Sequence, residues 1–528
     1  MGVVRVRERS FKNKVLGSFI GGQVDVPRAD HELATFTNLE IRPDGWAISR
    51  RGTSVVTTTS LTSSAILGLG TVTIEYGRWI VVAKSGSGYW YTIRVDDAVV
   101  GGSGWGATPL APSYDAVAAP IRMESVIDSA GSGWGVFASP DFATLVKWDG
   151  SSSSTVEVTG AGAPSHPRYI RVWNQYLFCV TDDSPTIIQF SNSGDPFSWP
   201  TTSKIIVEAS YGVITGLEAN PDMLLIFTDN VILALVGDPG DPNVGFKLIP
   251  IVPNVGCDVP GSIVSVAGRT SFVFRGTGYM FEGGADSIMS DRIRDFASSL
   301  VRKPGVAGLV ANSYAAMSPL RYAYRPCINV GYSPAANPNT DSFLYMFDRS
   351  RYNAWSVFDY PRSSAAGATD PVLPVIYMPD DYTLLMAGGD GELYSQSIRG
   401  DGDVSMGGDA PATGAVRIPV QSTLLTRVLT FGDSTMQKQY RRVLVGGTSD
   451  AGSASIGGVF LDPTETSTTG TALTGAKMPM QTDLPTVDGT DGLSLWGSIQ
   501  IQIQATSLLL RNITIQWRGV RWSTDGTL

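Results

Sequence analysis

The sequence predicts an all-β protein built around a central β-propeller of six to eight blades. The first observation is a recurring phrase, in which an apolar, aromatic-rich strand, a tight polar or glycine turn and a second such strand follow one another. The second is the alternation of Val, Ile, Thr and aromatic residues with small polar residues, the period of half-buried strands. The third is composition: the chain has 59 Gly and 31 Pro, and only 16% of its residues are charged. Long runs of strong helix formers are missing.

Seven hairpins of this kind start at intervals of roughly 40 to 70 residues, the range in which propeller blades and other arrayed β units repeat. They are residues 79–93, 134–148, 176–190, 223–237, 270–284, 342–358 and 382–396. A lone hairpin is marginal in water, and stacking hairpins around a ring covers their apolar faces while leaving only short edges. We therefore expect a propeller over residues 65–400. Another all-β fold with irregularly spaced hairpins is the alternative.

The preceding residues, 1–64, lack the hairpin phrase. A basic opening leads to the turn Arg42-Pro43-Asp44-Gly45, in which Pro and Gly stand where a tight reversal between two strands needs them. We expect an N-terminal extended arm that ends in a hairpin. The arm either wraps a neighbouring subunit or is a frayed terminus.

The last part, residues 401–528, begins with a Gly- and Asp-rich linker that breaks the hairpin pattern. Beyond the linker, apolar and polar positions alternate in residues 416–432, 438–449, 492–505 and 508–523. Ile499, Ile501 and Ile503 point to one face of their strand, because successive side chains of a strand alternate between faces. These patterns predict a C-terminal β-sandwich or barrel-like domain, with a polar, Thr-rich loop at 462–475.

The charge, hydropathy and cysteine content of the sequence exclude several classes of protein. The net charge is −9 and the isoelectric point is near 4.9, so the chain lacks the overall basic field with which proteins grip nucleic acid. No apolar run reaches 18 residues, so no membrane-spanning segment is expected. The three cysteines, Cys179, Cys257 and Cys327, are odd in number and irregularly spaced, which predicts neither disulfides nor a zinc site. We expect synthesis in a reducing cytoplasm and Cys179 in the core.

The sequence lacks recognisable catalytic, metal-binding and cofactor-binding motifs. The two histidines, His31 and His166, have no partner at ligand or triad spacing, and we expect both to be surface or structural residues. Asp401, Asp403 and Asp409 do not meet the spacing of a calcium loop. A sialidase-like site would need clustered arginines, a Tyr–Glu pair and an acid; residues 321–325 and 349–351 hold arginines and tyrosines without paired acids. We therefore predict no catalytic residue, no cofactor, no metal and no enzyme activity.

Several phrases together resemble the tail nozzle (tail tubular protein B-like) family of short-tailed bacteriophages. They follow in collinear order over residues 30–450: 33–53, 190–199, 224–238, 254–284, 286–296, 348–357, 388–394 and 437–445. The residues that carry the matched turns are Gly45, Gly52, Asp195, Trp199, Gly237, Gly256, Gly278 and Trp355. Beyond residue 450 no motif is assignable.

The resemblance implies a structural virion protein. In that family several copies, usually six, form a ring below the tail adaptor, and the genome leaves the capsid through its lumen. Expected partners are therefore further copies of the chain, the adaptor and portal-proximal proteins, and tail spikes or fibres. DNA would pass through the lumen without sequence-specific binding, because an acidic wall repels phosphates. The expected location is the virion tail, after assembly in the host cytoplasm.

The alternative is a receptor- or glycan-binding protein of a tail tip or baseplate. Trp90, Trp105, Trp134 and Tyr352 lie near glycine-rich turns, where aromatic rings would serve as sugar platforms. The same rings would otherwise pack between blades. Glycan binding by an isolated monomer would favour this alternative, and ring formation without glycan affinity would favour the nozzle.

Overall fold

A computed structural model of the chain describes residues 119–282 with short gaps at 239, 241–244, 267 and 276, and elsewhere the strands named below with a few adjoining residues. In these residues the protein is all-β, with two 3-10 turns at Ala209–Tyr211 and Pro260–Ser262 and no α-helix. Within the same residues, no helix has the length and hydropathy needed to cross a membrane. The all-β prediction is confirmed.

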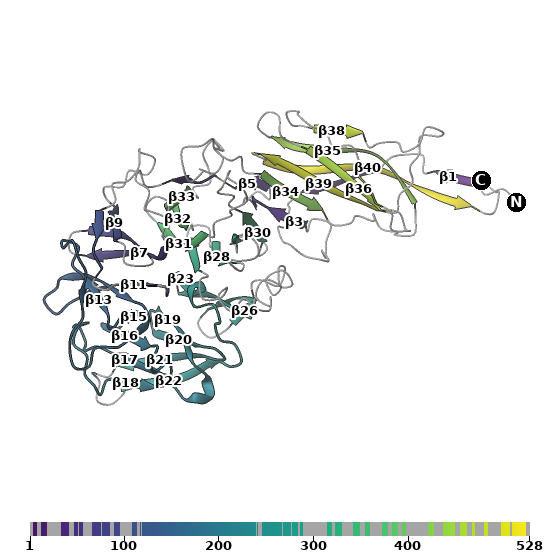
Figure 1. The fold of residues 1–528 in the computed structure, drawn as a ribbon. Helices are drawn as coiled ribbons and strands as arrows, with labels where there is room; N and C mark the ends of the chain where they lie inside the picture. The colour runs from purple at the N-terminus through teal and green to yellow at the C-terminus, as the bar shows by residue number, and fades with distance from the viewer. Residues whose placement is uncertain are drawn as a thin grey trace, which may run out of the picture.

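Five sheets of four consecutive strands form a β-propeller arrangement, numbered here as the first to fifth blades (Figure 1). The first blade consists of β7 (Ile66–Ile74), β8 (Gly77–Lys84), β9 (Trp90–Arg94) and β10 (Thr108–Leu110). The second blade consists of β11 (Arg122–Ile127), β12 (Gly133–Ala138), β13 (Val146–Trp148) and β14 (Val156–Glu157), and the third of β15 (Pro167–Trp173), β16 (Tyr176–Thr181), β17 (Ile187–Phe190) and β18 (Lys204–Ile206). The fourth blade consists of β19 (Ile214–Asn220), β20 (Met223–Thr228), β21 (Ile232–Asp238) and β22 (Gly245–Val252), and the fifth of β23 (Val264–Val266), β24 (Arg269–Phe274), β25 (Thr277–Phe281) and β26 (Asp286–Ile288). Each strand pairs antiparallel with the next, as hairpin connections dictate.

The first strands of the five blades contact one another in chain order, and outermost strands such as β18 and β22 lie at the rim (Figure 1). Two further sheets follow in the chain. One contains β27 (Tyr314–Ser318), β28 (Ala323–Asn329), β29 (Ser342–Asp348) and β30 (Ala354–Asp359); the other contains β31 (Val372–Met378), β32 (Thr383–Gly388), β33 (Leu393–Ser397) and, from the N-terminal part, β6 (Ser54–Val55). β27 contacts β23 and β31, and β31 contacts β7. All seven predicted hairpins are therefore present as antiparallel pairs.

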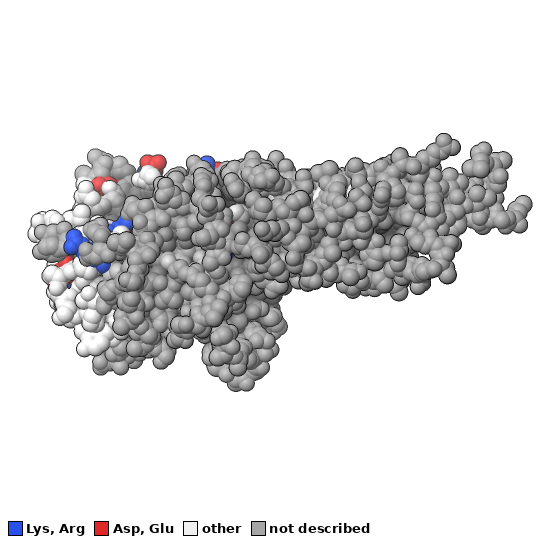
Figure 2. Space-filling model, turned by 90° about the horizontal axis from the view of Figure 1, so that it is seen from above, with Lys and Arg blue, Asp and Glu red and all other residues white. Residues whose placement is uncertain are grey.

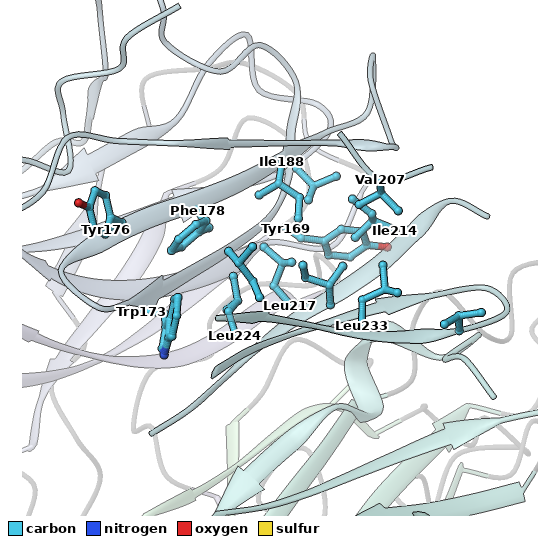
Figure 3. Close-up of a cluster of buried hydrophobic side chains, with 14 residues drawn as sticks. Tyr169, Trp173, Tyr176, Phe178, Ile188, Val207, Ile214, Leu217, Leu224 and Leu233 are labelled. Carbon is cyan, nitrogen blue, oxygen red and sulfur yellow. The ribbon is translucent and has the colours of Figure 1, made fainter. Parts of the chain in front are cut away.

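The core lies between neighbouring blades, because each sheet is apolar on both faces. Between the third and fourth blades, Tyr169, Trp173, Tyr176 and Phe178 meet Leu217, Leu224 and Leu233 (Figure 3). β16 shows the consequence in its sequence: all six of its residues are buried, so it reads as a continuous apolar run rather than an alternating one. Burial of apolar surface contributes about 25 cal/mol per Å², so such interfaces are a main source of stability for the five blades.

The N-terminal strands are distributed over the rest of the molecule. β1 (Val4–Arg7) and β2 (Lys12–Gly17) pair with β40 (Leu509–Ser523), and β6 pairs with β33. β4 (Leu39–Ile41) and β5 (Ala47–Ser49) form the expected hairpin, whose turn lies outside the described residues. Strands β1 and β2 of the expected N-terminal arm thus pair with β40 of the same chain.

The remaining strands are β3 (Leu33–Thr37), β34 (Gln421–Thr426), β35 (Gln437–Thr448), β36 (Ser455–Leu461), β37 (Ser467–Thr469), β38 (Met480–Asp483) and β39 (Ser498–Thr506). β3 lies between β30 and β34, so one nine-stranded sheet contains both β27–β30 and strands of the C-terminal part (Figure 1). The four predicted C-terminal strand regions all contain strands. The predicted Thr-rich loop is corrected in part, because β37 pairs there with β36. The boundaries at 64 and 400 and the sandwich or barrel form stay predictions.

Candidate functional site: a charged cluster on the inner strands

Polar side chains recur at a fixed spacing on the first strands of four consecutive blades. Glu124 lies on β11, Arg171 on β15 and Glu218 on β19, and each is 47 residues from the next. Ser265 on β23 stands at the same spacing beyond Glu218. The contacts described below show that these residues are neighbours on adjacent first strands. These four residues are called the inner-strand cluster below.

Arg171 joins three blades through one guanidinium group. Its Nη1 donates to Glu124 Oε1 of the second blade at 2.6 Å, and its Nη2 donates to Glu218 Oε1 of the fourth blade at 2.6 Å. The side chain of Glu218 is only 6% exposed, against 15% for Glu124 and 32% for Arg171. The planar, forked guanidinium suits this double contact, which a lysine ammonium would not reproduce.

Burial and the ion pairs with neighbouring side chains shift the pKa values of the cluster in opposite directions. Burial raises the pKa of Glu218 to about 7, although Arg171 lowers it, and the nearby Glu124 adds to the rise. Burial likewise raises the pKa of Glu124 against the opposing effect of Arg171. The pKa of Arg171 is raised, because the two carboxylates outweigh the desolvation that would lower it. The guanidinium is therefore charged at all relevant pH values, while Glu218 titrates near neutrality.

Hydroxyl and amide groups continue the cluster into the fifth blade. Glu218 is hydrogen bonded to the Ser265 side chain, and Ser265 Oγ lies 2.6 Å from Thr270 Oγ1. Thr270 Oγ1 in turn donates to Asn220 Oδ1 at 3.4 Å, and the main-chain oxygen of Asn220 accepts from Trp173 Nε1 at 3.1 Å. This polar network crosses every interface from the second to the fifth blade.

A cluster of aromatic rings adjoins the network at Trp173. Trp173, Tyr176, Phe178, Phe190 and Phe246 form successive ring contacts with centroid separations of 5.3–6.2 Å. They belong to the interface between the third and fourth blades, in which Figure 3 labels Trp173, Tyr176 and Phe178. Trp173 joins this aromatic cluster to the polar network, because its Nε1 donates to the main-chain oxygen of Asn220.

The arrangement can hold neighbouring blades in register. Among the described residues, no group of three or more His, Cys, Asp or Glu side chains is placed to hold a metal ion. On the face seen in Figure 2, the described charged side chains carry both signs and are scattered at the propeller end.

His166 is exposed, as expected, and its Nδ1 lies 2.8 Å from Asp183 Oδ2. Ser165 Oγ donates to the same oxygen at 2.9 Å, so the hydroxyl is directed at the acid.

The residues predicted to carry the matched turns occupy separate places. Trp199 packs between the second and third blades, and Asp195 Oδ1 accepts from the Phe197 main-chain N–H at 3.2 Å. Gly237 on β21 has a φ of 96°, a conformation that favours glycine. A Cβ at Gly256 would lie 2.2 Å from Thr228 O, so only glycine fits there.

Gly278 is buried on β25, and Gly52 is half-buried just before β6. Trp355 lies on β30 opposite Phe347, and its side chain is outside the described residues, as is all of Gly45. Those of these turn residues that the structure describes occupy separate places in the fold.

The aromatic residues considered as sugar platforms differ in exposure. Trp90 is fully buried and packs edge-on against Phe137 at 5.1 Å, so its assignment as a platform is wrong. Trp134 is half-buried, contacts Phe197 at 5.5 Å and has Lys147 Nζ 4.6 Å above its ring. Trp105, Tyr352, His31 and the three linker aspartates lie outside the described residues.

The cysteines for which the structure describes side chains are core residues. Cys179 and Cys257 are both buried and free. Burial raises the pKa of Cys179 well above the usual range, and it raises the pKa of Cys257 to about 12. The expectation that Cys179 is a core residue is confirmed.

The inner-strand cluster was not among the predicted sites. Its signal in the sequence is the 47-residue spacing of Glu124, Arg171 and Glu218. These three residues lie just before the recurring hairpins rather than inside them. Two acids and one arginine at a fixed spacing on equivalent strands are a pattern that a search for repeats could detect.

Comparisons with known proteins add little to this description. No family model matches the chain, and no curated protein matches it. Among solved structures, the crystal structure of BamB from Moraxella catarrhalis is similar over 67% of this chain and 99% of that chain, with 13% sequence identity and a TM-score of 0.34.

Proposed function

We propose that this chain is a structural subunit of a bacteriophage tail, and that several copies, six being favoured, form a nozzle ring that continues the DNA ejection channel below the tail adaptor. One structural observation supports the proposal most: β3 pairs with both β30 and β34. β27–β30 and strands of the C-terminal part are thereby one continuous sheet. A subunit of a conduit must keep its shape while a genome passes, and shared strands resist bending better than a flexible linker would.

Buried polar contacts reinforce the same junction. Arg50, which is 1% exposed, donates from Nε to Asn38 Oδ1 at 2.9 Å, and the Arg50 main-chain N–H donates to Asn38 O at 2.8 Å. Ser422 Oγ of β34 donates to the same Asn38 oxygen at 3.0 Å. A junction with satisfied buried polar groups favours one fixed arrangement of its parts. The collinear phrases that resemble the nozzle family, and the net charge of −9, support the proposal independently.

The proposal includes a propeller of seven blades. The first strands β7, β11, β15, β19, β23, β27 and β31 contact one another in order, and the contact between β31 and β7 would close the ring. β6 would then complete the last blade with a strand from the N-terminal part, which joins the ends of a propeller without a free edge. The prediction of six to eight blades includes this count.

The direct test is the mass of the purified full chain by light scattering at several concentrations, with and without its tail neighbours. A closed ring of several copies, or a monomer that forms one only on the adaptor, is the expected result. A stable monomer or trimer that never closes would contradict the nozzle. In that case binding to a glycan array would identify the receptor-binding alternative, and turnover of sialosides or capsule polymer would identify an enzyme.

A further inference from the structure

The inner-strand cluster has one more negative group than its single cation can neutralise. Arg171 contacts Glu124 with one nitrogen and Glu218 with the other, both at 2.6 Å. We propose that the cluster takes up one proton from solution as the pH falls, and that this proton strengthens the contact between the blades it joins. The site that takes up this proton spans the second, third and fourth blades.

The two carboxylates share one guanidinium group although they come from different blades. Each is on the inner strand of a different blade, and each approaches Arg171 from its own side. Glu218 is 6% exposed, so water does not compensate its charge. A surplus charge in such a place is strongly unfavourable unless it is neutralised, and protonation is the usual outcome.

Other charges do not offset the surplus. β19 packs against β15, β20 and β23, and β11 packs against β7, β12 and β15. On these strands, within the described residues, the titratable side chains are Arg168, Tyr169 and Arg171, all on β15. Arg168 is exposed and pairs with Asp182 at 2.8 Å. On β11 itself, Arg122 precedes Glu124 by two positions and is half-buried.

The hydroxyl groups beyond Glu218 show how the proton would be held. A protonated Glu218 still accepts a hydrogen bond from Arg171 and donates its new O–H to Ser265, with which it is hydrogen bonded. Ser265 then donates to Thr270 over 2.6 Å, and Thr270 donates to Asn220 Oδ1 over 3.4 Å. Every hydroxyl hydrogen in this chain has an acceptor.

The ionised state reverses part of the chain. A Glu218 carboxylate can only accept, so Ser265 must donate to it, and Thr270 must then donate to Ser265. The Thr270 hydrogen is no longer available to Asn220. Protonation therefore removes the surplus charge and also gains one hydrogen bond between the fourth and fifth blades.

The direction of the pH effect follows from the burial of Glu218, which raises the pKa from its usual 4.5 to about 7 in the folded protein. Below pH 4.5 the group is protonated in both folded and unfolded chains. Between pH 4.5 and about 7 only the folded chain holds the proton, so stability is lost as the pH rises through this range. One such group changes the unfolding equilibrium constant by up to about tenfold per pH unit.

The test compares denaturant unfolding of the full chain with that of Glu218→Gln at pH 5, 6, 7 and 8. The amide that this substitution introduces is neutral at every pH and can donate to Ser265 while accepting from Arg171, so it imitates the protonated state. We expect the wild-type unfolding constant to rise by up to about tenfold per pH unit relative to the variant between pH 5 and 7. Glu157→Gln, on the outermost strand β14, is the matched control and should follow the wild type.

The proposal is wrong if Glu218→Gln and the wild type change in parallel over this pH range. If Glu218→Gln does not fold, Glu124→Gln gives a second test, because it leaves Arg171 with a single carboxylate and removes the surplus. Glu218 should then stay ionised to lower pH, and the pH dependence should shift downward by a measurable fraction of a unit or more. An unchanged pH dependence in Glu124→Gln would also overturn the proposal.

Discussion

The hydroxyl groups of Ser49 and Ser422, 373 positions apart in the sequence, lie 2.7 Å from each other in a buried contact between β5 and β34. The contact ties the N-terminal hairpin to the C-terminal strands. Because Ser422 also donates to Asn38 O, one hydroxyl serves two segments at the junction.

Ser422→Ala should destabilise the chain. The substitution removes the hydrogen bond from Ser422 to Asn38 O and the contact with the Ser49 hydroxyl, at a cost of about 0.5–1.5 kcal/mol for each buried hydrogen bond lost. Denaturant unfolding would measure the loss. Ser153→Ala, at an exposed turn of the second blade, is the control and should change the free energy of unfolding little. Equal effects of the two substitutions would refute the role of the junction.

Trp199→Ala should impair folding or ring assembly. Trp199 is 8% exposed and packs in the cluster between the second and third blades, while its Nε1 has no hydrogen-bond partner. Its contribution is therefore packing, and removing a buried Trp typically costs about 3–5 kcal/mol. Expression yield, free energy of unfolding and solution mass would show the loss. Normal soluble expression together with normal assembly would count against the prediction.

Gly256→Ala should be more harmful than Gly131→Ala. A Cβ at position 256 would lie 2.2 Å from Thr228 O and 2.6 Å from Asn230 N, which are backbone atoms that cannot rotate away. At Gly131 nothing lies within 4 Å, and only its φ of 84° makes a side chain unfavourable, by roughly 1–2 kcal/mol. Thermal unfolding of both variants under one condition gives the order. The reverse order would show that the loop at 253–258 moves freely.

Arg171→Ala should destabilise the chain more at pH 8 than at pH 6. Without the guanidinium, two carboxylates remain in a water-poor site, and losing one partner of a buried ion pair costs about 3 kcal/mol or more. At pH 6 the carboxylates can escape part of this cost by taking up protons, because burial already raises the pKa of both Glu124 and Glu218. Unfolding measured at the two pH values tests this. A loss independent of pH would mean that only the packing of the side chain matters.

Cys179 and Cys257 should resist thiol reagents in the folded protein. Burial raises the pKa of both thiols, so the reactive thiolate is scarce and sterically shielded. Native chain treated with a chromogenic disulfide at pH 8 should therefore release at most the signal of Cys327, whereas unfolded chain should release that of all three cysteines. Rapid labelling of two or more thiols in the native chain would disprove the burial.

The hairpins were predictable because their signal is local. Apolar strands such as 223–228 and 232–238 flank a short turn that contains two polar residues, Asp229 and Asn230, and the pattern requires no knowledge of distant contacts. The buried state of Trp90 was not predictable in the same way. Its glycine-rich neighbourhood suggested a surface, but the ring fits between the first and second blades against Phe137 and Phe142.

Pairings between distant segments could not be predicted from local patterns. β6 has only two residues, and nothing in Ser54 and Val55 indicates that they pair with Ser395 and Tyr394. The inner-strand cluster has a sequence signal in its spacing, yet the spacing alone does not show that Arg171 reaches both acids. That contact depends on how three blades are rotated against one another.

The pairing of Val55 with Tyr394 also constrains how the protein is made. At about 5–20 residues per second, Tyr394 follows Val55 out of the ribosome by roughly 15 to 70 s. During that time β6 has no partner strand, and its unpaired edge is open to other chains. Translation speed and chaperone supply should therefore limit the yield of folded chain, and a circular permutant that begins near residue 56 would shorten the separation of the two partner strands from about 340 to about 190 residues.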